Sequence, residues 1–332
     1  MSALKHGNLA VFVPHIGCPH QCSFCEQRII SGADAAPTPQ DVAKLCESAI
    51  ANANNRVLEL AFFGGSFTMI DTDYMCALLG AAAEYVGKGI SGIRISTRPD
   101  AVGDEMLSLL AEYPVSAIEL GAQSMDDAVL KKNGRGHTAQ EVIDASARIK
   151  RFGFTLGLQM MLGLDGEDEK SGIETAEKLI ACASDTIRIY PTLVLENTEL
   201  AQRMAAGQYR PLTLQAGISR TARVMMLFER AGVRIIRVGL HPSKSLEQKL
   251  LAGPYHPAFR ELCEGQIMLE RLTAQLKNVP NGKINVGVHR NDISRMTGQK
   301  RCNIAALKAL GYDVAVVADA NANPLHPIII DN

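Results

Sequence analysis

The chain has 332 residues, of which 47% are hydrophobic and 21% charged, and its formal net charge is -1. This is the composition of an ordinary globular protein, and no run reaches the roughly 18 apolar residues that a membrane span needs. The first 15 residues lack the basic and then apolar stretches of a secretion signal, so we expect a cytoplasmic protein whose eight cysteines are thiols or metal ligands.

The first predicted strand, residues 9–15, leads into a loop that holds three cysteines. The loop, IGCPHQCSFCEQR, spans residues 16–28 and places Cys18, Cys22 and Cys25 in the spacing C-x3-C-x2-C. One tight loop of this spacing can reach three corners of a 4Fe-4S cluster and leaves one iron open to a further ligand. We therefore favour an iron-sulfur cluster at this loop.

Two other interpretations of the three thiols stay open. Gly17 and Pro19 suit the sharp turns of the loop whatever it binds. A structural zinc site would need a fourth protein ligand, for which His15 and His20 are the local candidates. His20 lies only two residues from the first cysteine, which strains ligation by both. The thiols could also be incidental.

Short apolar strands alternate with helices along most of the chain. Further strands are predicted at residues 56–65, 93–97, 115–124, 154–163, 186–195 and 233–240, and helices at residues 38–53 and 71–86 and from residues 103, 126, 138, 170 and 213. Strands separated by helices of ten or more residues imply parallel pairing with right-handed crossovers. We expect an α/β fold, a partial (β/α)6 TIM-type barrel over residues 1–240, with a small α/β C-terminal extension over residues 241–332. A doubly wound sheet is the less favoured alternative.

Unusual residues cluster where these strands end. They are Gly64-Gly65-Ser66, Ser96-Thr97-Arg98, Gly121-Ala122-Gln123, Gln159 to Met161 and Tyr190-Pro191. In barrel folds the loops at the carboxyl ends of the strands converge on one mouth, where ligand sites form. The cysteine loop follows the first strand, so we expect it to open onto the same mouth.

Basic residues are concentrated in the C-terminal part. Between Arg210 and Leu310 there are 17 Lys and Arg against 6 Asp and Glu. The helix from residue 213 is predicted to bury one face and to expose three arginines, either as a solvated face or as a phosphate-binding surface. Its buried face comprises Ile218, Ala222, Met225 and Phe228, and its exposed face Arg220, Arg223 and Arg230.

A second candidate phosphate-binding surface surrounds a helix start further along the chain. It comprises His289, Arg290, Arg295, Lys300 and Arg301. Within it, GQKRCNI resembles the glycine-flanked loop of KH RNA-binding modules, but the second glycine is absent, which argues against a KH module.

Several of these segments resemble the radical S-adenosylmethionine (SAM) superfamily. The cysteine loop, with Phe24 before its last cysteine, is similar to the superfamily's signature, and FFGGSF resembles its glycine motif. The segments STRPD, IELGAQSM with GRGHT, GLQMMLGLDGE and GPYHPAFREL look most like the branch that contains the Elongator catalytic subunit. The sequence has no segment that resembles the acetyltransferase domain of that subunit.

The resemblance implies site residues. Cys18, Cys22 and Cys25 would hold the 4Fe-4S cluster, and the glycine motif at Gly64, Gly65 and Ser66 would meet the methionyl amine of SAM, because glycine lets a ligand approach the backbone closely. Gln123 would face the ribose and Arg135 the methionyl carboxylate. The remaining SAM contacts that it implies are Phe24, Ser96 and Gln159.

The resemblance also implies an enzyme that cleaves SAM reductively to a 5′-deoxyadenosyl radical for hydrogen abstraction. We expect RNA, most plausibly a transfer RNA base, as the substrate, a flavodoxin or ferredoxin as the electron donor, and no membrane partner. The alternatives are a radical SAM enzyme acting on a small metabolite, such as a tetrapyrrole-like or acyl compound, and a non-enzymatic metal-binding module.

Other polar residues and thiols have less specific interpretations. His137 is either a loop residue or part of the SAM site, and Tyr190 either packs in the barrel wall or contacts substrate. Cys302 is expected to be structural, with a role in radical chemistry as the alternative, and the remaining cysteines are expected in the core. These core thiols are Cys46, Cys76, Cys182 and Cys263.

Overall fold

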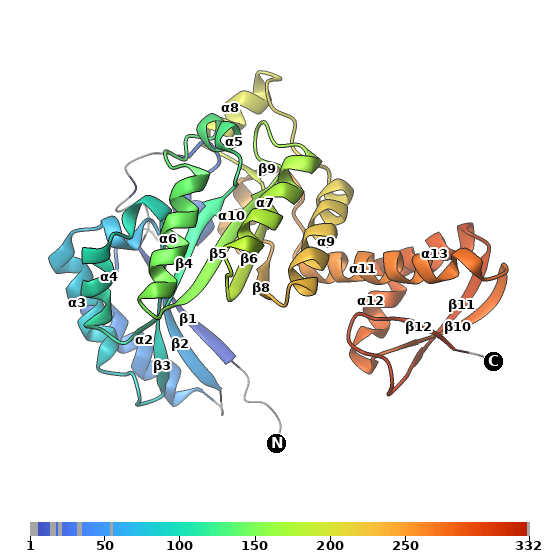
Figure 1. The fold of residues 1–332 in the computed structure, drawn as a ribbon, viewed down its shortest axis with the longest axis horizontal. Helices are drawn as coiled ribbons and strands as arrows, with labels where there is room; N and C mark the ends of the chain where they lie inside the picture. The colour runs from blue at the N-terminus through green and yellow to red at the C-terminus, as the bar shows by residue number, and fades with distance from the viewer. Residues whose placement is uncertain (1–5, 14–17, 19–21, 32–34, 54–55, 331–332) are drawn as a thin grey trace. The chain divides into compact units, whose positions relative to one another are not determined.

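The structure is a computed structural model, and it describes residues 6–13, 18, 22–31, 35–53 and 56–330 (Figure 1). The chain forms two compact units. Unit 1 contains Met1–Pro211 and Phe228–Gly253, and unit 2 contains Leu212–Leu227 and Pro254–Asn332. In the described residues, no helix combines the length and the apolar character needed to cross a membrane.

Unit 1 is built on a sheet of seven parallel strands. Neighbours in the sheet follow the order β1-β2-β3-β4-β5-β6-β8. The strands are β1 (His6–Val13), β2 (Val57–Gly64), β3 (Ile90–Thr97), β4 (Val115–Gln123), β5 (Thr155–Leu162), β6 (Thr186–Pro191) and β8 (Arg234–Val238). The sheet curls into a half-barrel, so the predicted partial barrel is confirmed and the doubly wound sheet is excluded.

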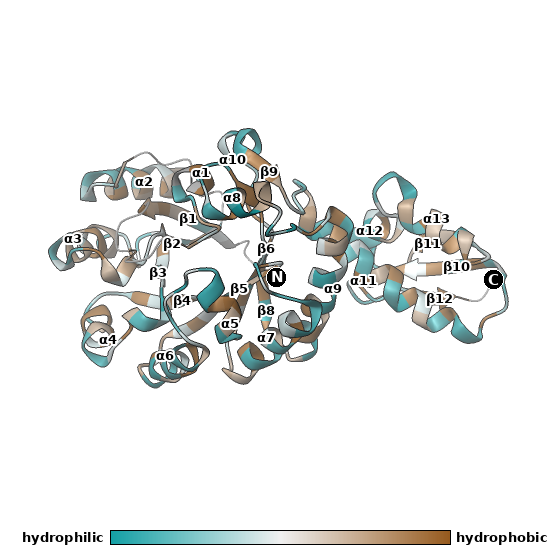
Figure 2. Ribbon diagram, turned by 90° about the horizontal axis from the view of Figure 1, so that it is seen from above, coloured by the Kyte–Doolittle hydropathy of each residue, from teal (hydrophilic) through white to brown (hydrophobic). Residues whose placement is uncertain are grey.

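Helices cover the outer face of this sheet. Seen from above, they form an arc outside the strands (Figure 2). They are α2 (Pro39–Ala51), α3 (Thr72–Ala83), α4 (Asp104–Ala111), α6 (Ala139–Arg151) and α7 (Glu169–Ala181). Local signals start three of them, because Thr38, Thr138 and Asp168 each form a capping box with the third helical residue.

Several short elements of unit 1 were not predicted. They are α1 (Gln27–Ser31), α8 (Glu199–Ala205), α10 (Lys244–Lys249) and the pair β7 (Val194–Leu195) and β9 (Leu250–Ala252). The predicted strand at residues 186–195 is therefore two strands. The chain leaves the sheet after Pro191, where the Thr192 N–H donates to the Leu162 carbonyl at 2.8 Å.

A chain of buried ion pairs crosses the inner face of the half-barrel. Arg94 donates to Glu59 on β2 at 2.8 Å and to Glu119 on β4 at 3.2 Å, and Arg188 on β6 donates to Glu119 at 2.6 Å. The side chain of Glu119 on β4 crosses the neighbouring strand β5 to reach Arg188 on β6, and it crosses at Gly157. A Cβ placed at Gly157 would lie 2.7 Å from Glu119 Cγ. The missing side chain therefore makes room for the Glu119–Arg188 ion pair.

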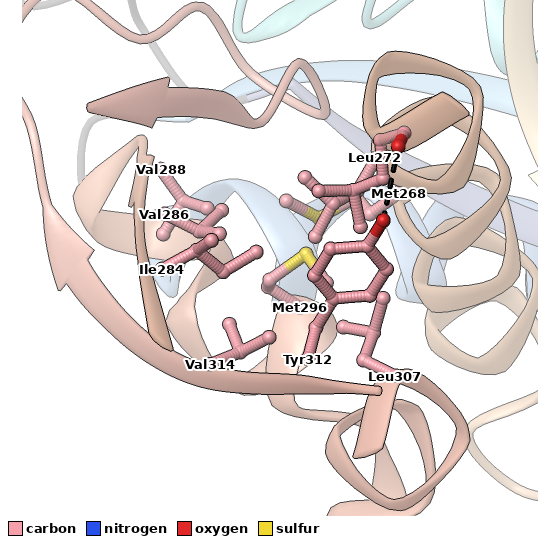
Figure 3. Close-up of a cluster of buried hydrophobic side chains, with 10 residues drawn as sticks. Met268, Leu272, Ile284, Val286, Val288, Met296, Leu307, Tyr312 and Val314 are labelled. Carbon is pink, nitrogen blue, oxygen red and sulfur yellow. Dashed lines mark hydrogen bonds between the residues drawn. The ribbon is translucent and has the colours of Figure 1, made fainter. Parts of the chain in front are cut away.

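Unit 2 combines a three-stranded sheet with helices. The sheet has the order β11-β10-β12, with β10 (Gly282–Val288) parallel to β11 (Tyr312–Ala318) and antiparallel to β12 (Ile328–Ile330). Its helices are α11 (Phe259–Gln275), α12 (Ile293–Thr297) and α13 (Cys302–Ala309). Figure 3 shows its core, in which the Tyr312 hydroxyl donates to the Leu276 carbonyl at 3.0 Å.

Helix α9 (Leu214–Arg230) contributes residues to both units. Its predicted buried face is confirmed: Ile218, Ala222, Met225 and Phe228 are all buried. The predicted division at residue 240 stays a prediction, as does a role in substrate binding for residues 241–332.

The cysteines outside the loop differ from one another in burial. Cys46 and Cys263 are fully buried, as predicted, whereas Cys76 and Cys182 are partly exposed. Cys302 lies at the surface of unit 2, where its Sγ donates to Asn303 Oδ1 at 3.6 Å, and the expectation that it is structural stays a prediction.

Candidate active site

The cysteine loop lies at the carboxyl end of β1. Cys22 is buried and Cys18 and Cys25 are partly exposed. The Cys25 N–H donates to the Cys22 carbonyl at 3.0 Å, which closes a tight turn between these two thiols. The Gln27 side-chain amide lies 3.6 Å from Cys18 Sγ.

The candidate zinc ligands His15 and His20, and the turn residues Gly17 and Pro19, lie outside the described residues. Among the residues that are described, no three His, Cys, Asp or Glu side chains come together closely enough to hold a single metal ion.

Ser23, between the second and third cysteines, anchors the loop to two distant segments of unit 1. Ser23 Oγ donates to Asn133 Oδ1 at 3.0 Å, the Ser23 N–H donates to the Asn133 carbonyl at 3.1 Å, and the Ser23 carbonyl accepts from the Leu200 N–H at 2.7 Å. Asn133 is fully buried, and its amide also donates to the Asp165 carbonyl at 2.9 Å. The sequence analysis did not identify Asn133, although its place two residues before Arg135 is a signal that could have found it.

Phe24 lies in an apolar cluster beside the loop. The cluster contains Cys22, Phe24, Val129, Leu164, Val194, Leu200 and Tyr209. The Phe24 ring is 8% exposed and packs with these side chains. This position gives Phe24 a structural role in holding the loop, whereas the predicted cofactor contact stays a prediction.

Arg135 joins the cysteine loop to the end of β4. Its Nη1 donates to Cys22 Sγ at 3.2 Å, and its Nη2 donates to the Gly121 carbonyl. The guanidinium is buried, and its Nε has no hydrogen-bond partner in the described part of the chain. A buried donor without a partner costs stability, so this atom is suited to a bound acceptor.

The electrostatics of the loop favour a neutral Cys25 thiol in the free protein. Burial, together with the neighbouring Cys22 and Cys18, raises the pKa of the Cys25 thiol from 9.0 to about 12, and Arg135 and Gln27 oppose that rise. Ligation would therefore release protons, because cysteine binds metals as the thiolate. The positive charge of Arg135 would then offset part of the negative charge of the thiolates.

Two glutamines meet beside this arginine. Gln159 Nε2 on β5 donates to Gln123 Oε1 on β4 at 3.2 Å. Gln123 is buried and follows a break in the β4–β5 register, and its φ of 66° is unusual for a residue with a side chain. Strained backbone of this kind concentrates at functional sites.

His137 supports the same end of β4 from within the protein. Its Nε2 lies 3.1 Å from the Ala122 carbonyl, so this nitrogen carries the proton of the neutral ring. Burial, and then the charge of Arg135, lower the pKa of His137 from 6.5 to about 4. Its Nδ1 is buried and without a hydrogen-bond partner among the residues described.

The glycine motif follows β2. Gly64 has a φ of +117°, and a Cβ there would lie 2.5 Å from the Val13 carbonyl oxygen. The Gly65 N–H donates to that oxygen at 2.9 Å. Close approach by a ligand is the predicted reason for these glycines, and for Gly64 the contact with Val13 on the neighbouring strand by itself requires glycine.

Ser66 is buried and bonded within the protein. Its Oγ lies 2.8 Å from Thr97 Oγ1 and accepts from the Arg98 N–H at 3.3 Å. Thr97 Oγ1 in turn lies 2.6 Å from Thr68 Oγ1. This hydroxyl network ties the glycine motif to the end of β3. The predicted contact of Ser66 with SAM stays a prediction.

Ser96 and Tyr190 complete the set of predicted residues. Ser96 on β3 is partly exposed and pairs in register with Glu119. Tyr190 on β6 is partly exposed, and burial of its hydroxyl raises the pKa of this group. The roles predicted for both residues stay predictions.

Taken as a donor set, these residues fit an iron-sulfur cluster. Three thiols stand on one loop, two of them, Cys22 and Cys25, pack against apolar side chains, and a buried guanidinium donates to Cys22. The reduction potential of an iron-sulfur cluster depends on hydrogen bonds to its cysteine sulfurs and on how far solvent reaches it. The free Arg135 Nε and the Gln123–Gln159 pair would then serve a polar ligand beside it.

Comparison with known proteins agrees with this assignment. The sequence pattern of the radical SAM superfamily matches residues 12–179, and that of the radical SAM C-terminal domain matches residues 184–269. The first match alone covers half of the chain.

Individual relatives are more distant. The chain is 29% identical to the uncharacterized protein MJ0486 of Methanocaldococcus jannaschii over 63% of this chain and 62% of that protein. It is 26% identical to a tRNA uridine(34) acetyltransferase of Dehalococcoides mccartyi over 61% of this chain and 52% of that protein. The chain thus spans between about half and two thirds of these relatives.

Among solved structures, Elp3 of Methanocaldococcus infernus has a similar fold. The TM-score is 0.64 at 19% sequence identity, over 80% of this chain and 63% of that one.

Proposed function

This chain belongs to the radical SAM superfamily, and we propose that Cys18, Cys22 and Cys25 hold a 4Fe-4S cluster with which it cleaves SAM. When bound and reduced, the cluster supplies the electron that splits SAM to a 5′-deoxyadenosyl radical, which abstracts hydrogen from a substrate. The observation that carries the proposal is the contact of Arg135 with both Cys22 Sγ and the Gly121 carbonyl, because it links the cysteine loop to the barrel strand that bears Gln123.

The chain's own residues would position the nucleotide beside the cluster. Arg135 has one buried N–H without a partner among the described residues, and this group would bind the methionyl carboxylate. Gln123 and Gln159 offer amide donors and acceptors for ribose hydroxyls, and Ser96 offers a hydroxyl on the adjacent strand β3. The backbone of Gly64, Gly65 and Ser66 would receive the methionyl amine.

Burial around the loop would keep water from the reacting centre. The apolar side chains that pack around Phe24 cover Cys22 on one side. The ion pairs of Glu119 with Arg94 and Arg188 occupy the inner face of the sheet. Exclusion of water protects a reactive intermediate from side reactions.

The substrate class that we propose is RNA, with a transfer RNA base as the modified group. In support, one relative is named a tRNA uridine(34) acetyltransferase and the matched fold is that of an Elp3. Unit 2 also has 11 Lys and Arg against 7 Asp and Glu, whereas the rest of the chain has 23 against 28. A net positive unit suits a polyanionic substrate. A flavodoxin or ferredoxin would supply the electron.

The test has two arms. Reconstituted anaerobically with iron and sulfide and then reduced, the protein should form 5′-deoxyadenosine from SAM, and the Cys22→Ala variant should not. Equal product from both would overturn the assignment of the cysteines. In the second arm, nucleosides from RNA of cells that lack the protein are compared by mass spectrometry with those of the parent cells. A missing modified nucleoside supports RNA, whereas an unchanged nucleoside profile with an altered small metabolite would overturn it.

A further inference from the structure

Unit 2 carries an exposed basic loop that the superfamily match does not cover. The C-terminal domain match ends at residue 269, and the loop, Gly298–Arg301, joins α12 to α13 between the parallel strands β10 and β11. Its side chains Lys300 and Arg301 are exposed.

The backbone of this loop is strained at the two basic residues. Lys300 has φ 51° and ψ 30°, and Arg301 has φ 62° and ψ 28°. Consecutive left-handed residues with side chains are unfavourable, because the Cβ approaches the following carbonyl oxygen. Arg301 occupies the place of the second glycine of a KH-type loop and adopts the backbone conformation that glycine would favour. The absent glycine therefore does not prevent a loop of this shape.

Hydrogen bonds of Asn303, in the first turn of α13, hold the loop in place. Asn303 is buried, and its amide donates to the Gly265 carbonyl at 2.9 Å and to the Arg295 carbonyl at 3.2 Å. A side chain at Gly298 would collide with Cys302 and Asn303, so glycine is required where the loop begins. A loop fixed in this way loses little conformational freedom on binding.

The two basic side chains also differ from other cations of unit 2. Arg295 forms ion pairs with Glu264, at 2.6 Å, and with Asp292, and Arg260 pairs with Glu264 at 2.8 Å. Arg295 is therefore engaged internally, which corrects its predicted place on a phosphate-binding surface. The Arg301 N–H donates to the Gly298 carbonyl at 3.0 Å, but the side chains of Lys300 and Arg301 make no hydrogen bond or ion pair with any residue that the structure describes, so both charges are available to a ligand.

An aromatic ring lies beside the loop. The partly exposed His256 accepts from the Ala258 N–H at 3.0 Å through Nδ1, and its Nε2 lies 3.2 Å from the side-chain amide of Gln299. These two contacts fix the orientation of the imidazole next to Lys300 and Arg301. Unpaired bases stack on rings of this kind, and histidine is among those used.

We propose that Gly298–Arg301 and His256 form a binding site for single-stranded RNA, which deepens the proposed function and rests on its RNA substrate. Lys300 and Arg301 bind consecutive backbone phosphates, and one unpaired base stacks on His256. A duplex keeps its bases stacked on one another, so the exposed ring favours a single strand.

The test uses the full chain under anaerobic conditions. Binding of a fluorescein-labelled 12-nucleotide oligouridylate is followed by anisotropy between 50 and 200 mM KCl. The Lys300→Glu/Arg301→Glu variant should bind at least about tenfold more weakly than wild type, and the slope of log K against log salt should shrink by about 1.4, or about 0.7 for each lost phosphate contact. The His256→Ala variant should bind about fivefold to tenfold more weakly, with an unchanged slope.

Two further variants keep the result interpretable. Lys277→Glu/Lys283→Glu makes the same charge change at exposed positions of unit 2, and it should weaken binding less than threefold. Lys300→Gly/Arg301→Gly removes the cations but relieves the backbone strain, so it should fold at least as stably as wild type and still bind weakly.

Several outcomes would overturn the site. They are equal weakening by the two charge-reversal variants, unchanged binding by the glycine variant, and tighter binding of an RNA duplex than of the single strand. Equal affinity for the matching deoxyoligonucleotide would overturn the assignment to RNA. Formation of 5′-deoxyadenosine by the wild-type protein is measured separately and without RNA, so its failure would count against the proposed function and not against this site.

Discussion

Replacing Gly157 with alanine should destabilise unit 1 although it adds only one methyl group. In most strands this substitution stabilises, because glycine loses more backbone entropy on folding. Here the new Cβ would lie 2.7 Å from Glu119 Cγ and 3.0 Å from Thr186 Oγ1, at the point where Glu119 crosses β5. Glu119 would have to move away from Arg188.

The magnitude follows from what Arg188 would lose. Arg188 is buried, and two of its nitrogens donate to Glu119, at 2.6 and 3.0 Å. Breaking a buried ion pair by removing one partner costs about 3–5 kcal/mol, and overpacking without loss of the pair costs about 1–3 kcal/mol. Because Glu119 can shift partly before the pair breaks, we expect the free energy of unfolding to fall by about 3 kcal/mol.

The assay is equilibrium unfolding in urea, followed by circular dichroism, with Gly80→Ala as the matched control. Gly80 lies within α3, and a Cβ there would meet no atom within 4 Å, so this variant should gain up to about 1 kcal/mol. In a Glu119→Ala background, Gly157→Ala should cost less than about 1 kcal/mol, because the collision is removed. A Gly157→Ala variant as stable as wild type, or one equally destabilised in both backgrounds, would refute the crossing of Glu119 at this glycine.

Three further predictions concern the candidate site. His137 has a pKa of about 4 in the folded protein and 6.5 as its unperturbed value, so its contribution is fully present above pH 6.5 and is lost as the pH falls toward 4. In wild type, the free energy of unfolding should therefore fall by up to about 3 kcal/mol between pH 6.5 and pH 4, and the His137→Gln variant should lack this fall. The same fall in the variant would contradict the burial of a neutral ring. Asn133→Ala removes the side-chain partner of Ser23 Oγ and the amide bond to the Asp165 carbonyl, and it should speed reaction of the Cys22 thiol with a disulfide reagent in the iron-free protein by about tenfold or more, whereas an equal rate would show that the Asn133 side chain does not anchor the loop. Arg135→Lys keeps the charge but cannot span Cys22 and the Gly121 carbonyl together, and it should lower 5′-deoxyadenosine formation by roughly 10- to 100-fold, where a rate close to wild type would refute the role of the guanidinium.

The parts of the fold that sequence could predict are those that depend on local pattern. Apolar strands alternating with capped helices require parallel pairing, and the seven-stranded half-barrel follows from that repetition. The cysteine loop was recognisable because its three ligands are close together in the chain. The buried face of α9 followed from helical periodicity.

The contacts that assemble the site could not be predicted, because they join distant residues. Arg135 and Cys22 are 113 residues apart, and nothing local to either one specifies the contact. A second reason for glycine at position 64 could not be predicted for the same cause: the atom that a side chain there would meet belongs to Val13 on another strand. The backbone conformation of Gln123, Lys300 and Arg301 could not be predicted from the sequence either, because these residues adopt positive φ values that residues with side chains disfavour.

The most direct measurement is the iron-sulfur content of the reconstituted protein, with its electron paramagnetic resonance spectrum after reduction. We predict about four iron and four sulfide per chain and a spectrum that changes when SAM is added, because three cysteines leave one iron open. Each single alanine variant of Cys18, Cys22 and Cys25 should lose the spectrum, while the Cys302→Ala variant, which changes an exposed thiol of unit 2, should keep it. Full iron content in the Cys22→Ala variant, or a wild-type spectrum that SAM leaves unchanged, would contradict a cluster held at this loop.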